Sequence, residues 1–396
     1  MNIIGNKKKL TVIGGGTAGA ITALQLYNTH TKEVVWYRDP SSKTQSVGEA
    51  STLGIPTLLH YGLKFHYKDL PKIEGTSKRG IRKINWGHQS SKDFIHGFDL
   101  HTTALHFSAV KFQNYIYNSL KPYIKIIESP SLNLAEIDSD YIFDCTGKPK
   151  EYSDFVMSQA IPVNSAYVVN CFWDKPKYDY SFHIARPYGW VFCIPLQKRM
   201  SVGYMYNSNI SSLEEIKKDI NNIFEQLNLT PSTEITEWNF KNYFRKENFT
   251  NRVCYNGNSS FFLEPLESTS TGFMIDINQI ALNLLDKNIS LSQANKSYHS
   301  IITDLQEMIT MHYFSGSSFD TPFWQNAISI SENFLQKSFK NSNFKSFYKQ
   351  IQSFKNSNHL GIAFNQPVHA QWGINNWDQN LKGLNLYNKL NKLINI

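Results

Sequence analysis

The chain has 396 residues, of which 41% are hydrophobic and 18% charged, as is typical of a folded globular protein. The formal net charge is +8, but the basic residues are spread along the chain without a recognisable nucleic-acid-binding module, so we expect no nucleic-acid partner. No stretch approaches the roughly 18 apolar residues of a membrane span. The four cysteines have no paired spacing, which indicates neither a metal site nor a disulfide framework, and we expect a soluble, cytoplasmic protein.

The N-terminal segment predicts a dinucleotide-binding unit. Residues 10–13 form an apolar run typical of a buried strand, a glycine-rich turn follows over residues 14–19, and residues 17–28 have helical spacing. Residues 33–37 predict the next strand. In such a unit glycine allows a tight turn and a close approach of the backbone to a pyrophosphate, which the helix N-terminus stabilises. Asp39 lies near the place where an acid binds the adenosine ribose.

The rest of the chain predicts more strands and then helices. Residues 81–86 and 141–145 are interpreted as strands. Residues 155–245 have the alternation of short antiparallel strands, with a helix near residues 212–227, and helical spacing dominates after residue 272. Residues 336–359 are rich in Lys, Asn, Ser and Phe, a composition compatible with a loose loop.

Several sequence motifs occur in order between residues 14 and 269. The most unusual is Glu264-Pro-Leu-Glu267-Ser-Thr269, in which two acids bracket a proline and hydroxyl residues follow. It is preceded by Gly14-Gly-Gly-Thr-Ala-Gly19, Ser46-Val-Gly-Glu-Ala-Ser51, Asp144-Cys-Thr-Gly147 and Tyr188-Gly-Trp190-Val-Phe192-Cys-Ile194-Pro195. Together these motifs resemble the GGGTAG, GVGEAT, DxTG, WxWxIP and EPLEST signatures of the flavin-dependent halogenases of the tryptophan-halogenase family.

The resemblance implies a fold class of α/β (α+β): a Rossmann-type FAD-binding domain of the flavin monooxygenase kind, an inserted antiparallel sheet and a C-terminal helical substrate-binding part. The domains that we predict are residues 1–154 with 246–285 for FAD, residues 155–245 for the inserted sheet, and residues 286–396 for the helical part.

The implied activity is an FADH2- and O2-dependent halogenase that generates hypohalous acid at the flavin and halogenates an electron-rich aromatic such as an indole or a phenol. Lys78 matches the setting of the family's active-site lysine, which would hold the hypohalous acid or a haloamine and aim the halogen. Glu267 matches the catalytic glutamate, which would stabilise the cationic ring and take its proton. Without the resemblance, a lysine in a basic run is most often a solvated surface group, and Glu267 could support a helix start.

The implied cofactors are FAD, as FADH2, and a halide ion, which could be chloride, bromide or iodide. Residues implied to bind the cofactor are Gly14, Gly16, Thr17, Ala18, Gly19, Asp39, Val47, Gly48, Glu49, Ala50, Ser51, Trp190, Phe192 and Ile194. Residues implied to bind the halide are Thr269 and Ser270, and those implied to contact the substrate are His96, Phe98 and Trp377.

The chain departs from the family pattern at three positions. Arg38 stands where the family has its acid, Phe192 replaces the second tryptophan of WxWxIP, and Ser270 replaces the glycine that follows EPLEST. These departures bear on ribose recognition, on the separation of substrate from flavin and on halide access, respectively.

A single dinucleotide motif favours delivery of FADH2 by a separate flavin reductase. The other implied partner is an aromatic small molecule, and a homo-oligomer is compatible with the sequence. Two alternatives stay open: a flavin-dependent aromatic monooxygenase that acts without halide, and a non-catalytic FAD-binding protein. Formation of a product that depends on halide would separate the three.

Overall fold

A computed structural model describes residues 8–29, 33–41, 48–87, 93–98, 103–129, 134–355 and 367–394. The chain divides into two units, which we describe one at a time. The first comprises Met1–Thr76, Ala104–Met157 and Tyr243–Ser300, and the second comprises Ser77–Thr103, Ser158–Asn242 and Ile301–Ile396. Val47, which is implied to bind the cofactor, lies outside the described residues.

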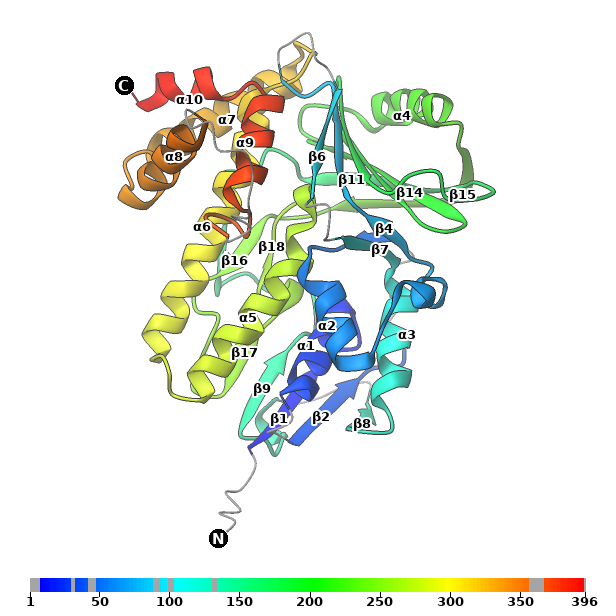
Figure 1. Ribbon diagram of the computed structural model, residues 1–396, viewed down its shortest axis with the longest axis vertical. Helices are drawn as coiled ribbons and strands as arrows, with labels where there is room; N and C mark the ends of the chain where they lie inside the picture. Colours follow the sequence, from blue (N-terminus) through cyan, green and yellow to red (C-terminus); the bar gives the residue numbers. More distant parts are fainter. Residues whose placement is uncertain are drawn as a thin grey trace. The chain divides into compact units, whose positions relative to one another are not determined.

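A parallel five-stranded sheet forms the centre of the first unit. Its strands are, in spatial order, β17 (Val253–Tyr255), β9 (Tyr141–Asp144), β1 (Lys9–Ile13), β2 (Glu33–Arg38) and β8 (Lys125–Glu128). Leu10 and Val12 of β1 are completely buried, as expected for a strand that is covered on both faces. Helix α1 (Thr17–Asn28) packs on β1 and β2, with α3 (Ala109–Leu120) and α5 (Thr269–Leu285) beside it (Figure 1).

The turn between β1 and α1 requires glycine at two positions. Gly14 has a φ of 122°, and a Cβ atom on it would lie 2.2 Å from the carbonyl oxygen of Cys145. A Cβ atom on Gly19 would lie 2.0 Å from the carbonyl oxygen of Gly14. The strand, glycine turn and helix that the sequence predicts are therefore confirmed, and the helix has the predicted bounds.

Smaller elements complete the first unit. Strand β3 (Gly48–Ala50) pairs antiparallel with β7 (Ala104–Ser108). A second antiparallel sheet consists of β10 (Phe155–Met157), β16 (Tyr243–Arg245) and β18 (Phe261–Phe262). The short helical elements are α2 (Gly54–Leu63), η1 (Tyr67–Ile73), η2 (Leu134–Glu136), η3 (Gly257–Ser259) and η4 (Leu266–Ser268).

A seven-stranded sheet forms the centre of the second unit, which the chain enters along β4 (Thr76–Lys78). Its neighbouring strands pair antiparallel except β12 and β5, which are parallel. The spatial order is β15 (Thr230–Asn239), β11 (Ser165–Phe172), β14 (Arg199–Tyr206), β13 (Gly189–Pro195), β12 (Ser181–Arg186), β5 (Gly80–Ile84) and β6 (Asp93–Gly97).

The two faces of this sheet differ in chemistry. One face packs its apolar residues, among them Val191 and Cys193, against helix α4 (Leu213–Leu227) (Figure 1). The Ser212 hydroxyl and the Glu215 carboxylate form a capping box that starts α4. Because side chains alternate along a strand, Trp190 and Phe192 lie on the opposite face.

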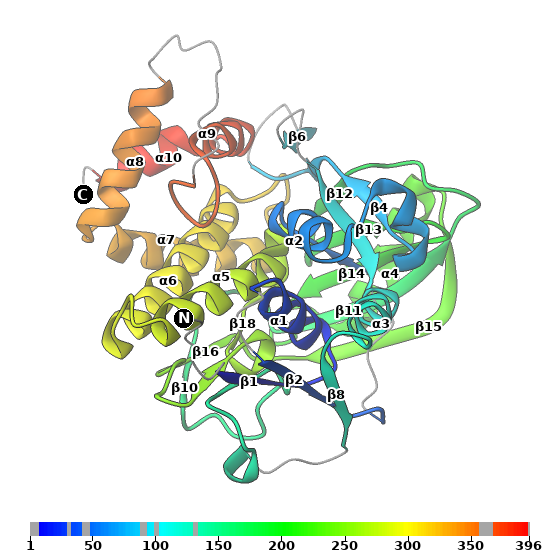
Figure 2. The same ribbon diagram turned by 60° about the horizontal axis from the view of Figure 1, so that its bottom comes forward.

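Helices dominate the C-terminal part, as the sequence predicts. They are α6 (Leu291–Ser315), α7 (Pro322–Ser338), α8 (Ser342–Lys355), α9 (Ile374–Gly383) and α10 (Tyr387–Ile394). Within the second unit α8 contacts α9, and α10 contacts α7 (Figure 2).

Residues 336–359 have a composition that is compatible with a loose loop, but their described part is mostly helical. Helix α7 continues to Ser338, and α8 follows. The buried residues of α8 are Phe344, Phe347, Tyr348 and Ile351, which have the spacing of one helical face. Packing of this face outweighs the polar composition of the segment.

The predicted fold class is confirmed: a parallel Rossmann-type sheet is combined with antiparallel sheets and C-terminal helices. Across the described residues, every helix is too short or too polar to serve as a membrane span. All four cysteines are buried as free thiols.

The glycine turn generates a prediction about stability. Gly19→Ala should lower the free energy of unfolding by about 1–3 kcal/mol, because the new methyl group would clash with backbone. Gly16→Ala is the matched control, since its φ of −75° suits alanine and the described residues leave its Cβ position open. Urea unfolding of both variants measures the difference, and equal losses would contradict the packing that we describe.

Candidate active site

In the first unit, several of the predicted cofactor residues lie near the start of α1. The Thr17 hydroxyl donates a hydrogen bond of 3.0 Å to Glu49 Oε1 and accepts one of 3.1 Å from Gln113 Nε2. The Thr271 hydroxyl donates to the carbonyl oxygen of Ala50 at 3.3 Å. The segment from Gly48 to Ser51 is thereby tied both to the glycine turn and to the start of α5.

The glycine turn leaves room for a phosphate group. A Cβ atom on Gly16 or Gly147 would meet no described atom within 4 Å. Gly16 caps α1 without a side-chain hydrogen bond, so the first N–H groups of this helix are available to an anion. Because the backbone is accessible and the helix terminus favours negative charge, these residues fit the pyrophosphate of FAD.

Two residues at the end of β2 differ in what they offer a nucleotide. Asp39 Oδ1 accepts hydrogen bonds from the Ser41 amide at 2.8 Å and the Ser41 hydroxyl at 2.6 Å, so this carboxylate stabilises its own turn. Arg38 lies beside the glycine turn, because a Cβ atom on Gly15 would be 3.3 Å from Arg38 Cβ. Its guanidinium group is 4.0 Å from the centre of the Tyr117 ring. From the sequence, Arg38 is identified only as a departure from the family pattern. At this place in the structure, however, an arginine is suited to bind a phosphate group.

Glu49 has an unusual carboxyl group. Its Oε2 atom is buried and has no hydrogen-bond partner among the described residues. Burial raises the pKa of Glu49 to about 7, although the hydrogen bond from Thr17 lowers it in part. The carboxyl group therefore titrates close to neutral pH.

The segment that contains the predicted catalytic residue Glu267 directly precedes α5 in the first unit. Glu264 is 0% exposed and Glu267 is 4% exposed. Glu267 and Ser268 have φ angles of 65° and 58°, in the left-handed region that costs an L-residue roughly 1–2 kcal/mol. Strain of this kind is concentrated at functional sites. Thr269 is the first residue of α5 and Ser270 the second, so the predicted halide residues lie at a helix N-terminus.

Lys78 is the predicted catalytic residue in the second unit. It is only 1% exposed, and its Nζ atom is 5.5 Å from the centre of the Phe98 ring. The Phe98 ring meets the His96 ring edge-on, with 5.9 Å between centres. The structure thus brings Lys78 together with two of the three residues that are implied to contact the substrate.

Two tryptophans follow on the other side of His96. The Trp372 ring is 4.4 Å from the His96 ring and is partly exposed. Trp377 is 1% exposed, lies 4.8 Å from Trp372, and donates its indole N–H to the His369 carbonyl at 3.0 Å. Trp377 therefore supports Trp372, a residue that the sequence reasoning missed. The signal in the sequence that could have drawn attention to Trp372 is a tryptophan five positions before the predicted one.

The predicted flavin-side residues of β13 share one face of the strand. Trp190 is completely buried and donates its indole N–H to the Tyr313 hydroxyl at 2.8 Å. Phe192 and Ile194 are partly exposed. A Cβ atom on Gly203 of β14 would lie 2.1 Å from the Phe192 ring, so this glycine makes room for the phenylalanine that replaces the family's second tryptophan.

The matching family is that of tryptophan halogenases, whose model covers residues 9–124 and 127–375. Among curated relatives, the tryptophan 7-halogenase RebH of Lentzea aerocolonigenes is 26% identical over 203 residues, which cover 48% of this chain and 38% of RebH. The match therefore spans well under half of that relative's length.

Solved structures of similar fold cover almost the whole chain. The flavin-dependent halogenase Xcc4156 of Xanthomonas campestris has a TM-score of 0.77 at 17% identity, over 98% of this chain and 94% of its own. The flavin-dependent halogenase BrvH of Brevundimonas sp. BAL3 has a TM-score of 0.73 at 20% identity, over 98% and 92%. At these identities the likeness establishes the fold.

Glu49 generates a prediction about pH. Its pKa is raised from 4.5 to about 7 in the folded chain, so the folded state binds more protons than the unfolded state between these values. Stability contributed by the neutral carboxyl group is present below pH 4.5 and is lost as the pH rises to about 7. Glu49→Gln should therefore become more stable than the original chain over this range, by about 3 kcal/mol at most.

Urea unfolding at several pH values measures this difference. The matched control is Glu33→Gln, which removes a carboxylate at an exposed position. A constant difference for Glu49→Gln would show that Glu49 is not held in its neutral form.

Proposed function

We propose, from the premise that the chain belongs to the tryptophan halogenase family, that it uses FADH2, O2 and a halide to halogenate an electron-rich aromatic ring. The observation that carries this proposal is the burial of Lys78 beside the rings of Phe98 and His96. Burying an ammonium group is costly, and this one lies next to the partly exposed ring of Phe98, where it would be close to a bound aromatic substrate.

The first unit supplies residues that would hold FAD. The glycine turn and the start of α1 would bind its pyrophosphate, with Arg38 beside them, and residues 48–51 would lie along the cofactor. When bound, reduced FAD supplies with O2 the two-electron oxidation that converts halide to hypohalous acid. The backbone N–H groups of Thr269 and Ser270, at the start of α5, would bind the halide.

Lys78 would control where the oxidised halogen goes. Its amine can donate a hydrogen bond to hypohalous acid, or exchange an N–H for an N–halogen bond and release water. The aromatic carbon then takes the halogen, and the lysine nitrogen recovers a proton from water. Holding the halogen at one place confines the reaction to one ring position. We propose that Glu267, buried in the first unit, accepts the proton that leaves the ring carbon.

The rings of His96, Phe98 and Trp372 would hold the substrate. Flat side chains bind flat ligands through offset and edge-to-face contacts, and Phe98 and Trp372 are both partly exposed. RebH is named as a tryptophan 7-halogenase, so tryptophan and other indoles are the first substrates to test. Trp190, Phe192 and Ile194 would provide bulk between substrate and flavin, and a separate reductase would deliver FADH2 to a soluble, cytoplasmic enzyme.

The direct test supplies the purified chain with FAD, a flavin reductase, NADH, O2 and each halide. Free tryptophan, indoles, phenols and tryptophan-containing peptides are then searched by mass spectrometry for halogenated products. Lys78→Met should lower the rate of halogenation by at least about 100-fold, because positioning of the halogen is lost. Peroxide release and FAD binding should continue.

Lys218→Met is the matched control, since Lys218 is an exposed lysine on α4 of the same unit, and it should keep full activity. An oxygenated product that forms without halide would favour the monooxygenase alternative. FAD binding with no product from any substrate would favour the non-catalytic alternative. Loss of FAD binding in Lys78→Met would contradict the role that we give to this lysine.

A further inference from the structure

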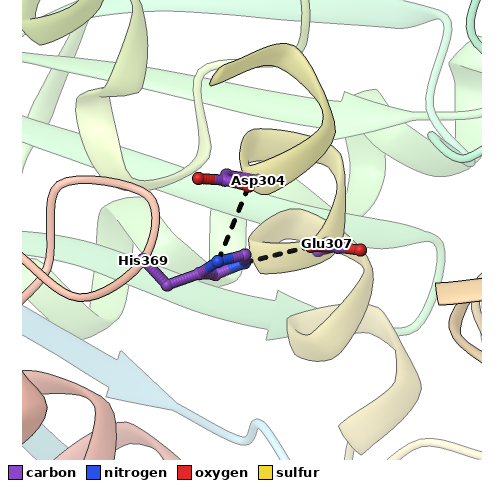
Figure 3. A group of neighbouring side chains, drawn as sticks. All are labelled: Asp304, Glu307 and His369. Atoms are coloured by element: carbon purple, nitrogen blue, oxygen red, sulfur yellow. Dashed lines mark ion pairs between the residues drawn. The ribbon is translucent and has the colours of Figure 1, made fainter. Parts of the chain in front are cut away.

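A group of three ionisable side chains, two of them buried, lies in the second unit, and the proposed chemistry does not use it. His369 Nδ1 is 3.6 Å from Asp304 Oδ1, and His369 Nε2 is 3.2 Å from Glu307 Oε2. Figure 3 shows the imidazole ring facing both acids, which project from α6. The side chains of His369 and Glu307 are 6% and 3% exposed, and that of Asp304 is 33% exposed.

The arrangement favours a structural role for the imidazole ring over a metal site. These three residue types are able to ligate a metal, but a histidine offers a metal one ring nitrogen at a time. Here each nitrogen faces a different carboxylate. The ring therefore lies between two acids of one helix, and these contacts fix its position. The ring is also stacked on Phe347 of α8, with 4.1 Å between centres.

His369 begins a tight turn whose conformation its central residues disfavour. Ala370 and Gln371 have φ angles of 47° and 65°, and neither is a glycine. The turn closes through a hydrogen bond of 2.9 Å from the Trp372 amide to the His369 carbonyl. Two successive positive φ angles are typical of type I′ turns, for which Asn-Gly is strongly preferred. The sequence of this turn therefore needs support from outside.

Asp304 supports the turn through two contacts. Burial raises the pKa of its carboxyl group, while His369 and a hydrogen bond from the Ala370 amide lower it and Glu307 raises it. The same carboxylate thus contacts both the first and the second residue of the turn. Its position on α6, a helix of 25 residues, makes it a firm anchor.

The turn ends at Trp372, whose ring lies 4.4 Å from His96. We propose that His369, held between Asp304 and Glu307, is a positioning residue that keeps the turn in its left-handed conformation and so fixes Trp372 against His96. This inference rests on the proposed function, because Trp372 and His96 are there assigned to the substrate site.

Kinetics provide the first test. His369→Gln should raise KM for the aromatic substrate roughly tenfold, the equivalent of one lost aromatic contact. Peroxide release without substrate should not change, since the turn has no part in the chemistry at the flavin. His60→Gln is the matched control, an exposed histidine of the first unit, and should leave KM unchanged.

A rescue variant separates positioning from a general loss of stability. Ala370→Asn combined with Gln371→Gly gives the turn its preferred residues, so in the His369→Gln background it should return KM to within about twofold of the original. If His369 contributed only to the stability of the core, these two substitutions in the turn would not restore KM. Failure of the rescue variant to restore KM would overturn the proposal.

Two measurements are independent of turnover. Fluorine NMR of fluorotryptophan-labelled protein, assigned with Trp372→Phe, should show the Trp372 signal shift in His369→Gln and return in the rescue variant. An unmoved Trp372 signal, or stoichiometric binding of added Zn²⁺ or Mn²⁺ that His369→Gln abolishes, would overturn the inference. Absence of halogenation would refute the proposed function. The fluorine signals would still show whether His369 fixes the position of Trp372.

Discussion

The free-energy cost of burying charge is the constraint on which the rest of this structure depends. Lys78, Lys83, Glu264 and Glu267 are between 0% and 4% exposed, and an ionised group in such surroundings is expensive unless other groups compensate it. Lys83 shows how the compensation works: its ammonium group donates to Asn380 and lies 5.7 Å from the rings of Phe94 and Trp372. Groups held in this way are fixed before any ligand arrives, and the low local dielectric strengthens each interaction that they make.

The sheet of the second unit explains why polar groups can be kept there without loss of the core. Alternation along the strands sends the apolar residues toward α4, where they form a continuous cluster. The opposite face carries Lys83, His183 and Phe192, which are neighbours in the strand register. The apolar core thus lies on one face of the sheet, and the other face holds buried polar and aromatic side chains. Left-handed backbone conformations occur at Glu267 and Ser268 and again at Ala370 and Gln371. At both places the backbone sets the direction of side chains that we assign to the site.

Local sequence patterns predicted the elements whose structure is locally determined. The glycine turn and α1 have their predicted bounds because strand, turn and helix follow one another within one short segment. The position of Trp372 could not be predicted, since it depends on positive φ angles at two residues that normally avoid them. Arg38 beside Gly15, and His369 between two acids of α6, are contacts over long sequence separations that no spacing rule contains. The parallel pairing of β12 with β5 is of the same kind.

We propose that the ammonium group of Lys78 and the carboxylate of Glu267 act on a single aromatic ring. The most direct measurement is a crystal structure of the chain with FAD and a halogenated substrate bound. We expect Lys78 Nζ and the Glu267 carboxylate to contact the same substrate ring, with Phe98 and Trp372 covering its faces. A structure in which the two groups lie on opposite surfaces of the molecule, or in which the ring binds away from Lys78, would contradict the account.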